Sequence, residues 1–459
     1  MLFSSITFIY FFLPILILIY FITPKKYRNI PLLLFSLIFY FLGEPKYIII
    51  LLASCIINYY LSILTSKKKY SKIFLTISLI YNIGQLLYFK YTDFFISNLN
   101  NIFNLNISLF HILMPIGISF FTFQIIAYII DVYNNKHQPA KNLLTFMTYV
   151  CLFPQLVAGP IVRYSDIENE LKNRKCSFEL FSEGIKRFII GLSKKVLIAN
   201  VLGEISKELI TETVLSSWLK PILFTLQIYY DFSGYSDMAI GLGLIFGFRF
   251  LENFNYPLIA SSVTDFWRRW HISLSSWFRD YVYIPLGGNR VSKIKWIRNI
   301  IIVWFLTGFW HGANWNFIIW GLYFVIFLLI EKLFLGKYLE KTKIIKYIYT
   351  ILIVIISFLI FNTESFPNII NSLKNMFYIN NISFTSLETT YYLKSNLILI
   401  IISIIGATPL LKNIIIKIKK TKLKIGLDIL EPIILLGLLT LTTAYLIDAS
   451  FNPFLYFRF

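Results

Sequence analysis

Long apolar segments recur along the whole chain, and they constrain its fold more than any other feature. Each is about as long as the roughly 20 residues that a helix needs to cross the hydrocarbon core of a membrane. Of the 459 residues only 14% are charged, against about 25% in an average soluble domain. The sequence predicts an all-α polytopic membrane protein, with residues 1–459 forming a single domain of about 10 to 12 membrane elements.

The net charge of +20 arises from lysine and arginine clusters in short loops between apolar segments. Cytoplasmic loops carry such an excess, so we expect loops 66–72 and 412–424 inside and the polar segment 362–394 outside. This distribution argues against a nucleic-acid partner. The three cysteines lack C-x-x-C spacing and the four histidines lie far apart, so we expect neither a metal site nor a bound cofactor.

The segment “TGFWHGANWNF” (307–317) contains a histidine within an otherwise apolar stretch. No Asp, Glu, Lys or Arg occurs between Asn299 and Ile330, and basic residues flank the stretch at its start. Both ends are expected in the cytoplasm, so the chain should turn back near Gly312, with His311 near the middle of the bilayer. A single long tilted helix is the alternative.

An ionisable residue at such depth usually faces a cavity and marks a functional site. A histidine with a pKa near neutrality suits a general base that removes a hydroxyl proton. Trp310, Asn314 or backbone N–H groups could stabilise the resulting oxyanion. The alternative is a structural imidazole that bonds to a neighbouring carbonyl or indole.

A second constellation lies in residues 264–281, where the spacing predicts an amphipathic helix capped by Thr264 or Asp265. Its apolar face comprises Phe266, Trp270, Leu274, Trp277 and Tyr281. The opposite face is basic, which suits either a membrane interface or an anionic cytosolic substrate with His271 at its entrance. The residues expected to steer such a donor are Arg268, Arg269, Arg279 and Arg290.

Two further segments combine polar and apolar residues. Residues 143–162 are apolar but contain Pro154, Gly159 and Pro160, which predicts a broken or re-entrant element. The segment 229–241 contains two aspartates, Asp231 and Asp237, which could form a structural polar cluster or a cavity wall. Neither a phosphate-binding loop nor a serine-hydrolase motif is present.

Five motifs in this order resemble one protein family. They are “CLFPQLVAGPIVR” (151–163), “YYDFSGYSDMAIGLG” (229–243), “DFWRRWHISLSSWFRDYVYIPLGGNR” (265–290), “TGFWHGANW” (307–315) and “NPFLYFRF” (452–459). Together they resemble the membrane-bound O-acyltransferase (MBOAT) superfamily, and within it the bacterial alginate and cell-wall polysaccharide O-acetyltransferases. The resemblance runs over nearly the whole chain.

The resemblance implies a ring of tilted helices around a central tunnel, with re-entrant and interfacial helices. His311 matches the catalytic histidine deep in that tunnel, and His271 matches a second histidine nearer its cytosolic mouth. The expected donor is a cytosolic acyl thioester, acetyl-CoA. The expected partner is an extracytoplasmic acetyltransferase that esterifies a polysaccharide outside the bacterial cytoplasmic membrane, whose lipids surround the chain.

The residues expected to line the tunnel or support the site are Trp310, Asn314, Arg279, Asp280 and Asp237. A related activity, D-alanyl transfer to teichoic acids, is an alternative, although “YVYIPLGGNR” favours the polysaccharide branch. A transporter or lipid-handling pore is the alternative from another class, because broken helices also mark transporters. Such proteins usually contain internal repeats, and we see none with matched interrupted halves.

Overall fold

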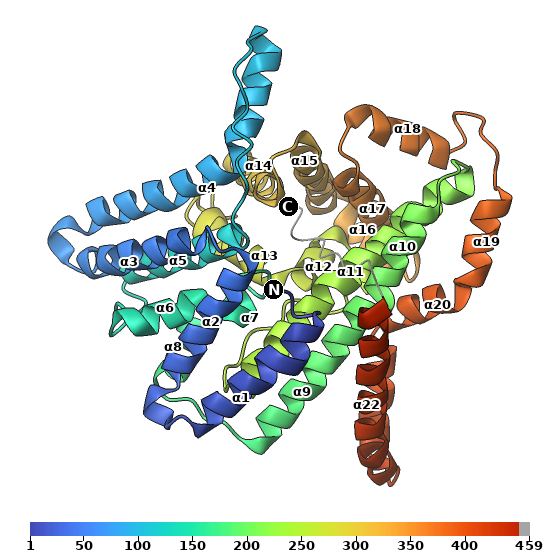
Figure 1. Cartoon of the computed structure of the whole chain (residues 1–459). Coiled ribbons are helices and arrows are strands. Elements are labelled where there is room, and N and C mark those ends of the chain that lie inside the picture. The colour runs from blue at the N-terminus through green and yellow to red at the C-terminus, as the bar shows by residue number, and fades with distance from the viewer. Residues whose placement is uncertain (449–459) are drawn as a thin grey trace. The chain divides into compact units, whose positions relative to one another are not determined.

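The computed structural model describes residues 1–448, and every regular element in this range is a helix. The predicted all-α class is therefore confirmed. The charge distribution also predicts an outer C-terminus, but that end of the chain and the motif at 452–459 lie outside the described residues. Figure 1 shows the order of the helices along the chain.

Several helices in the described range are long and apolar enough to cross a membrane, so the chain is a multi-pass membrane protein. Five helices meet this condition, and a pair bent by 56° makes a possible sixth span. They are Ile48–Thr65, Lys68–Phe103, Trp315–Lys341, Ile345–Asn362 and Lys424–Asp448, with the bent pair Leu387–Ser395 and Leu397–Gly406. The larger count of about 10 to 12 membrane elements, which includes shorter segments, stays a prediction.

The chain divides into two compact units, each described here by itself. Unit 1 comprises Met1–Phe188 and Tyr235–Glu252, and unit 2 comprises Ile189–Gly234 and the chain from Asn253 onward. The single domain expected from the sequence stays a prediction.

Unit 1 contains eight α-helices and most of a ninth. They are α1 (Leu13–Ile22), α2 (Asn29–Gly43), α3 (Ile48–Thr65), α4 (Ser71–Phe103), α5 (Ile118–Tyr133), α6 (Leu143–Cys151), α7 (Phe153–Leu156), α8 (Tyr164–Lys172) and α9 (Phe178–Ser193). The predicted break within 143–162 is confirmed, because α6 and α7 are separated at Leu152 and no helix follows until Tyr164. Between α3 and α4, Asn82 Nδ2 donates to Asn58 Oδ1 over 2.8 Å, so buried amides join the two helices.

Unit 2 continues from the end of α9 and holds both histidines of interest. Its elements are η4 (Lys194–Asn200), α10 (Val201–Glu208), most of α11 (Val214–Ile245), α12 (Val263–Arg269), α13 (Ile272–Phe278), η6 (Arg279–Tyr283), α14 (Lys293–His311), α15 (Trp315–Ile330), η7 (Glu331–Leu335), α16 (Gly336–Lys341), α17 (Ile345–Asn362), α18 (Phe366–Met376), α19 (Leu387–Ser395), α20 (Leu397–Gly406), α21 (Leu410–Lys419) and α22 (Lys424–Asp448).

The sequence predicts two spans, 214–231 and 235–250, but the structure has one continuous helix, α11. Gly234 lies inside it, where the added Cβ of any other residue would come within 2.7 Å of the Gly191 carbonyl oxygen. The glycine therefore provides close helix packing here and does not end the helix.

The predicted continuous helix over 264–281 is wrong. α12 ends at Arg269, Trp270 is extended, and His271 has a left-handed backbone with φ of 43° before α13 begins. Adjacent residues of a helix point about 100° apart, so this break lets Trp270 and His271 both point inward. The five apolar residues of the predicted face are nevertheless buried. The N-cap is Ser262, whose hydroxyl accepts from the Asp265 N–H over 3.0 Å.

The predicted turn after His311 is confirmed, because α14 and α15 form a helical hairpin around residues 312–314 (Figure 1). Glycines at the crossing make the hairpin tight. A Cβ at Gly308 would collide with the Phe317 carbonyl oxygen, and one at Gly321 would collide with the Trp304 carbonyl oxygen. The alternative of a single tilted helix is thereby excluded.

The glycine crossing gives the first testable prediction. Gly308→Ala should lower the thermal stability of the purified protein, because overpacking against a backbone oxygen costs about 1–3 kcal/mol. Gly437→Ala is the matched control, since a Cβ at this exposed position in α22 meets no atom within 4 Å. Equal melting temperatures for the two variants would contradict the tight crossing.

Candidate functional site

The α14–α15 hairpin places His311 at the last position of α14, just before the turn. Its side chain is only 4% exposed. Three aromatic rings meet the imidazole edge to face: Trp310 and Trp320 each at 5.0 Å and Phe361 at 5.3 Å between ring centroids. We call these three residues the aromatic cage. Trp315 of the same segment, by contrast, is exposed.

Trp310 also connects the cage to the second histidine. The His271 ring lies 6.1 Å from the Trp310 ring and 4.6 Å from the Phe232 ring. His271 is 1% exposed, and this burial lowers its pKa, so the imidazole is neutral at physiological pH. The structure therefore brings His271 and His311 together in one aromatic cluster of unit 2.

The orientation of His271 depends on Asn253. The amide oxygen of Asn253 lies 3.2 Å from His271 Nδ1. It also accepts from the backbone N–H and the hydroxyl of Ser273. Because Oδ1 acts as the acceptor, Nδ1 carries the proton of the neutral ring and Nε2 is the basic nitrogen.

Two indole N–H groups near His311 are buried without an acceptor in residues 1–448. They belong to Trp320, which is 1% exposed, and Trp267, whose ring centroid lies 5.6 Å from that of Trp320. A buried donor without an acceptor costs about 1–3 kcal/mol, so such a group in a native structure calls for an explanation. A ligand oxygen bound near His311 would supply one.

Asn316 positions the far wall of the cage. Its Nδ2 donates to the carbonyl oxygen of Phe361 over 2.9 Å, which ties the start of α15 to the end of α17. Asn314, predicted to assist the oxyanion, is the half-buried N-cap residue of α15 and has an extended backbone; its role stays a prediction.

The predicted basic residues are distributed differently from the expected continuous face. Arg279 makes two hydrogen bonds to Asp280, at 2.6 and 3.2 Å, and Arg269 bonds to Asp265 at 2.9 Å. Their charges are therefore largely compensated. The remaining predicted donor-steering residues, Arg268 and Arg290, are exposed.

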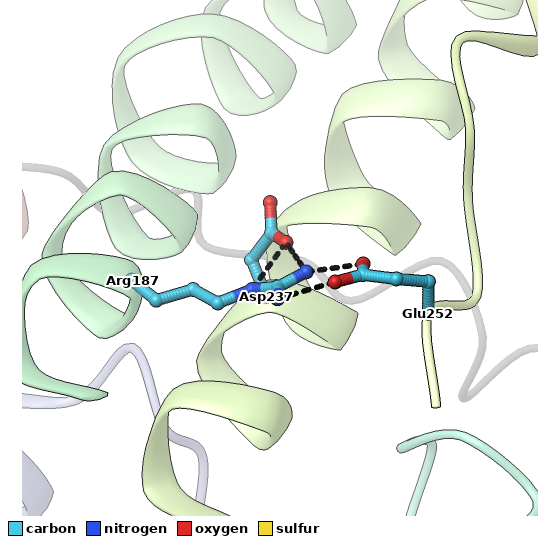
Figure 2. Close-up of polar contacts among 3 residues, drawn as sticks. All are labelled: Arg187, Asp237 and Glu252. Atoms are coloured by element: carbon cyan, nitrogen blue, oxygen red, sulfur yellow. Dashed lines mark hydrogen bonds and ion pairs between the residues drawn. The ribbon is translucent and has the colours of Figure 1, made fainter. Parts of the chain in front are cut away.

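The two aspartates of the 229–241 motif make separate contacts. Asp231 pairs with Lys195 at 2.7 Å within unit 2, and both side chains are almost fully buried. Asp237 accepts from Arg187 Nη2 at 2.9 Å within unit 1, and the same guanidinium also contacts Glu252 (Figure 2). Pairing of both acids with basic side chains favours the structural interpretation of this motif.

Sequence reasoning missed Asn253 and Phe361. Asn253 lies in a loop 18 residues before His271. The spacing of residues in the sequence does not predict a contact between this amide and an imidazole at a break between two helices. Phe361 lies at the end of an ordinary apolar span. The unpaired N–H of Trp320 could not be inferred without coordinates.

Comparison with known proteins identifies the family. Residues 136–393, which include both histidines, match MBOAT, the membrane-bound O-acyltransferase family. The chain is 37% identical to “Probable alginate O-acetylase AlgI” of Pseudomonas putida over the full length of both proteins. It is 41% identical to the protein of the same name in Azotobacter vinelandii, over 80% of this chain and 76% of that protein.

Two relatives carry other names. The “Peptidoglycan O-acetyltransferase” of Helicobacter pylori is 35% identical over 84% of this chain and 82% of its own length. The “Teichoic acid D-alanyltransferase” of Bacillus subtilis is 31% identical over only 50% of this chain and 61% of its own length. The chain belongs to the membrane-bound O-acyltransferase family, in the branch of the bacterial polysaccharide O-acetyltransferases.

Proposed function

We propose that this enzyme moves an acetyl group from a cytosolic thioester, acetyl-CoA, towards polysaccharide outside the cytoplasmic membrane, with His311 as the general base. The observation that carries the proposal is the burial of His311 in the aromatic cage at the turn of an apolar hairpin. Few structural roles require an imidazole in such a place, whereas proton transfer does.

In the proposed reaction, His311 accepts the proton of the acceptor hydroxyl as the hydroxyl oxygen bonds to the acyl carbon. The carbonyl oxygen then carries negative charge until the carbon–sulfur bond breaks. The imidazolium returns the proton to the leaving thiolate, so the histidine ends neutral. Transfer is direct in this scheme, because no nucleophilic side chain is required.

The developing oxyanion needs a hydrogen-bond donor, and we propose the indole N–H of Trp320. Its ring lies against His311, and its Nε1 has no acceptor among the described residues. A donor that is already oriented and dehydrated stabilises developing charge without reorganisation. Trp310, one of the three kinds of donor that the sequence suggests, lies on the side of His311 that leads to His271.

His271 is proposed to line the approach of the donor. Asn253 fixes its ring and burial keeps it neutral, so it can offer a hydrogen bond without placing a charge beside the thioester. The tunnel, with Arg279 and Asp280 along it, and the extracytoplasmic partner transferase belong to the same proposal.

The acceptor class is proposed to be polysaccharide, without a narrower choice. Relatives named for alginate and for peptidoglycan are similarly related to this chain. Related membrane proteins thus carry the names of very different polymers. We therefore propose that the outer partner determines which polymer is acetylated. D-alanyl transfer is less supported, since the relative of that name matches only half of this chain.

His311→Ala should reduce acetyl transfer by about 10²- to 10⁴-fold, the usual contribution of a general base. The measurement is cleavage of radiolabelled acetyl-CoA by the purified protein, together with acetylation of the cell's polysaccharide. His111→Ala is the control, since His111 is exposed. Near-normal transfer in a folded His311→Ala protein would refute the general base, and acetyl-CoA efflux without cleavage would favour the transporter.

Replacing Trp320 by β-(3-benzothienyl)alanine removes only the N–H and keeps the ring shape. The expected result is a fall in kcat of about 10²-fold or more, typical of losing one oxyanion donor, with an unchanged melting temperature. The same replacement at Trp218, whose Nε1 donates to the Met376 carbonyl oxygen over 2.8 Å, should lower stability but spare kcat. An unchanged kcat at Trp320 would exclude it as the donor.

A further inference from the structure

A polar pocket of about 400 Å³ lies in unit 2, at the open end of the α14–α15 hairpin. The residues that line it are Tyr283, Asn289, Val291, Lys293, Trp296 and Lys332. Lys293 begins α14, and Lys332 follows the end of α15. The pocket and His311 therefore lie at opposite ends of one helical hairpin.

Asn289, which lines this pocket, belongs to the “PLGGNR” loop (285–290), and specific contacts hold the conformation of that loop. Gly287 and Gly288 adopt positive φ angles of 98° and 56°. The buried Asn299 donates from Nδ2 to the carbonyl oxygens of both Leu286 and Gly288, at 3.1 and 3.0 Å. These contacts make the loop preorganised.

The charge of the pocket is positive and uncompensated. Within residues 1–448, neither Lys293 nor Lys332 forms an ion pair. The nearest carboxylate in sequence, Glu331, is buried and accepts instead from the backbone N–H groups of Val263 and Thr264, at 2.6 and 3.1 Å. Two lysines without an ion pair therefore line this pocket together with two aromatic residues, Tyr283 and Trp296.

Building on the proposed function, we infer that this pocket binds the phosphate groups of the thioester donor, between Lys293 and Lys332. Lysine binds phosphate as a point charge. Tyr283 and Trp296 offer ring faces on which a planar base can stack, an interaction that any nucleobase can make. The pocket thus suits a donor that carries phosphates and a nucleobase.

The length of the hairpin indicates how far the phosphates of the donor must lie from its acyl group. α14 has 19 residues, so at about 1.5 Å per residue it is roughly 28 Å long. The arm of phosphopantetheine contains about 13 bonds between phosphorus and sulfur, or about 16 Å when extended at the spacing of a peptide chain. A second phosphate and the length of a lysine side chain add to this distance. A donor with such an arm therefore spans most of the distance between the pocket and His311. An acyl phosphate, whose acyl carbon is bonded directly to phosphate oxygen, does not.

The test replaces both lysines, Lys293→Gln and Lys332→Gln, in full-length protein in nanodiscs of neutral lipid. Loss of two charge-assisted contacts should raise the KM for acetyl-CoA about tenfold or more, with little change in kcat. Acetyl-pantetheine has no phosphate, so its KM should be the same for wild-type and variant protein. The control variant, Lys417→Gln with Lys419→Gln, removes the same charge from α21 and should leave both KM values unchanged.

Three outcomes would overturn the inference: an equal rise in KM for acetyl-pantetheine, an equal effect of the control variant, or an unchanged KM for acetyl-CoA. Loss of binding to phosphatidylglycerol vesicles with an unchanged Kd for CoA would also overturn it, and would assign the pocket to a lipid headgroup. Binding of CoA by calorimetry separates this inference from the proposed function. Lysine-dependent CoA binding without acetyl transfer would refute the function and leave the pocket assigned.

Discussion

The close contact between α14 and α15 is the constraint on which the candidate site depends. Gly308 and Gly321 let each helix approach the backbone of the other, and this approach brings Trp320 of one helix against His311 at the end of the other. A larger side chain at either glycine would separate the helices and open the aromatic cage. The hairpin therefore determines both the depth and the surroundings of the imidazole.

Several buried polar groups fix the elements that surround the aromatic cage. Asn253 holds His271, Asn316 holds Phe361, and Glu331 holds the start of α12. These contacts fix the elements around the cage, because an unbonded polar group inside an apolar core is costly. The indole N–H groups of Trp320 and Trp267 have no acceptor in residues 1–448, and we propose that the substrate uses the one on Trp320.

Much of the architecture could be predicted from hydrophobicity and charge. The apolar spans, the turn after His311, the broken element after Leu143 and the burial of the 264–281 apolar face all follow from local composition and periodicity. The break at His271 could not be predicted, because helical spacing is satisfied on both sides of it and the left-handed backbone depends on tertiary packing. Contacts between residues far apart in the sequence could not be predicted either. An example is the hydrogen bond from Asn316 to Phe361, which lies 45 residues later.

The most direct test of the role of the cage is to locate the acyl group on the enzyme. A CoA thioester with a short, diazirine-bearing acyl chain can be bound to His311→Ala protein, irradiated and mapped by peptide mass spectrometry. Labelling should fall on Trp310, Trp320 and Phe361. Labelling instead in the apolar cavity of about 300 Å³ that Leu226, Ile355 and Ile404 help to line would contradict the assignment of the reacting centre to His311.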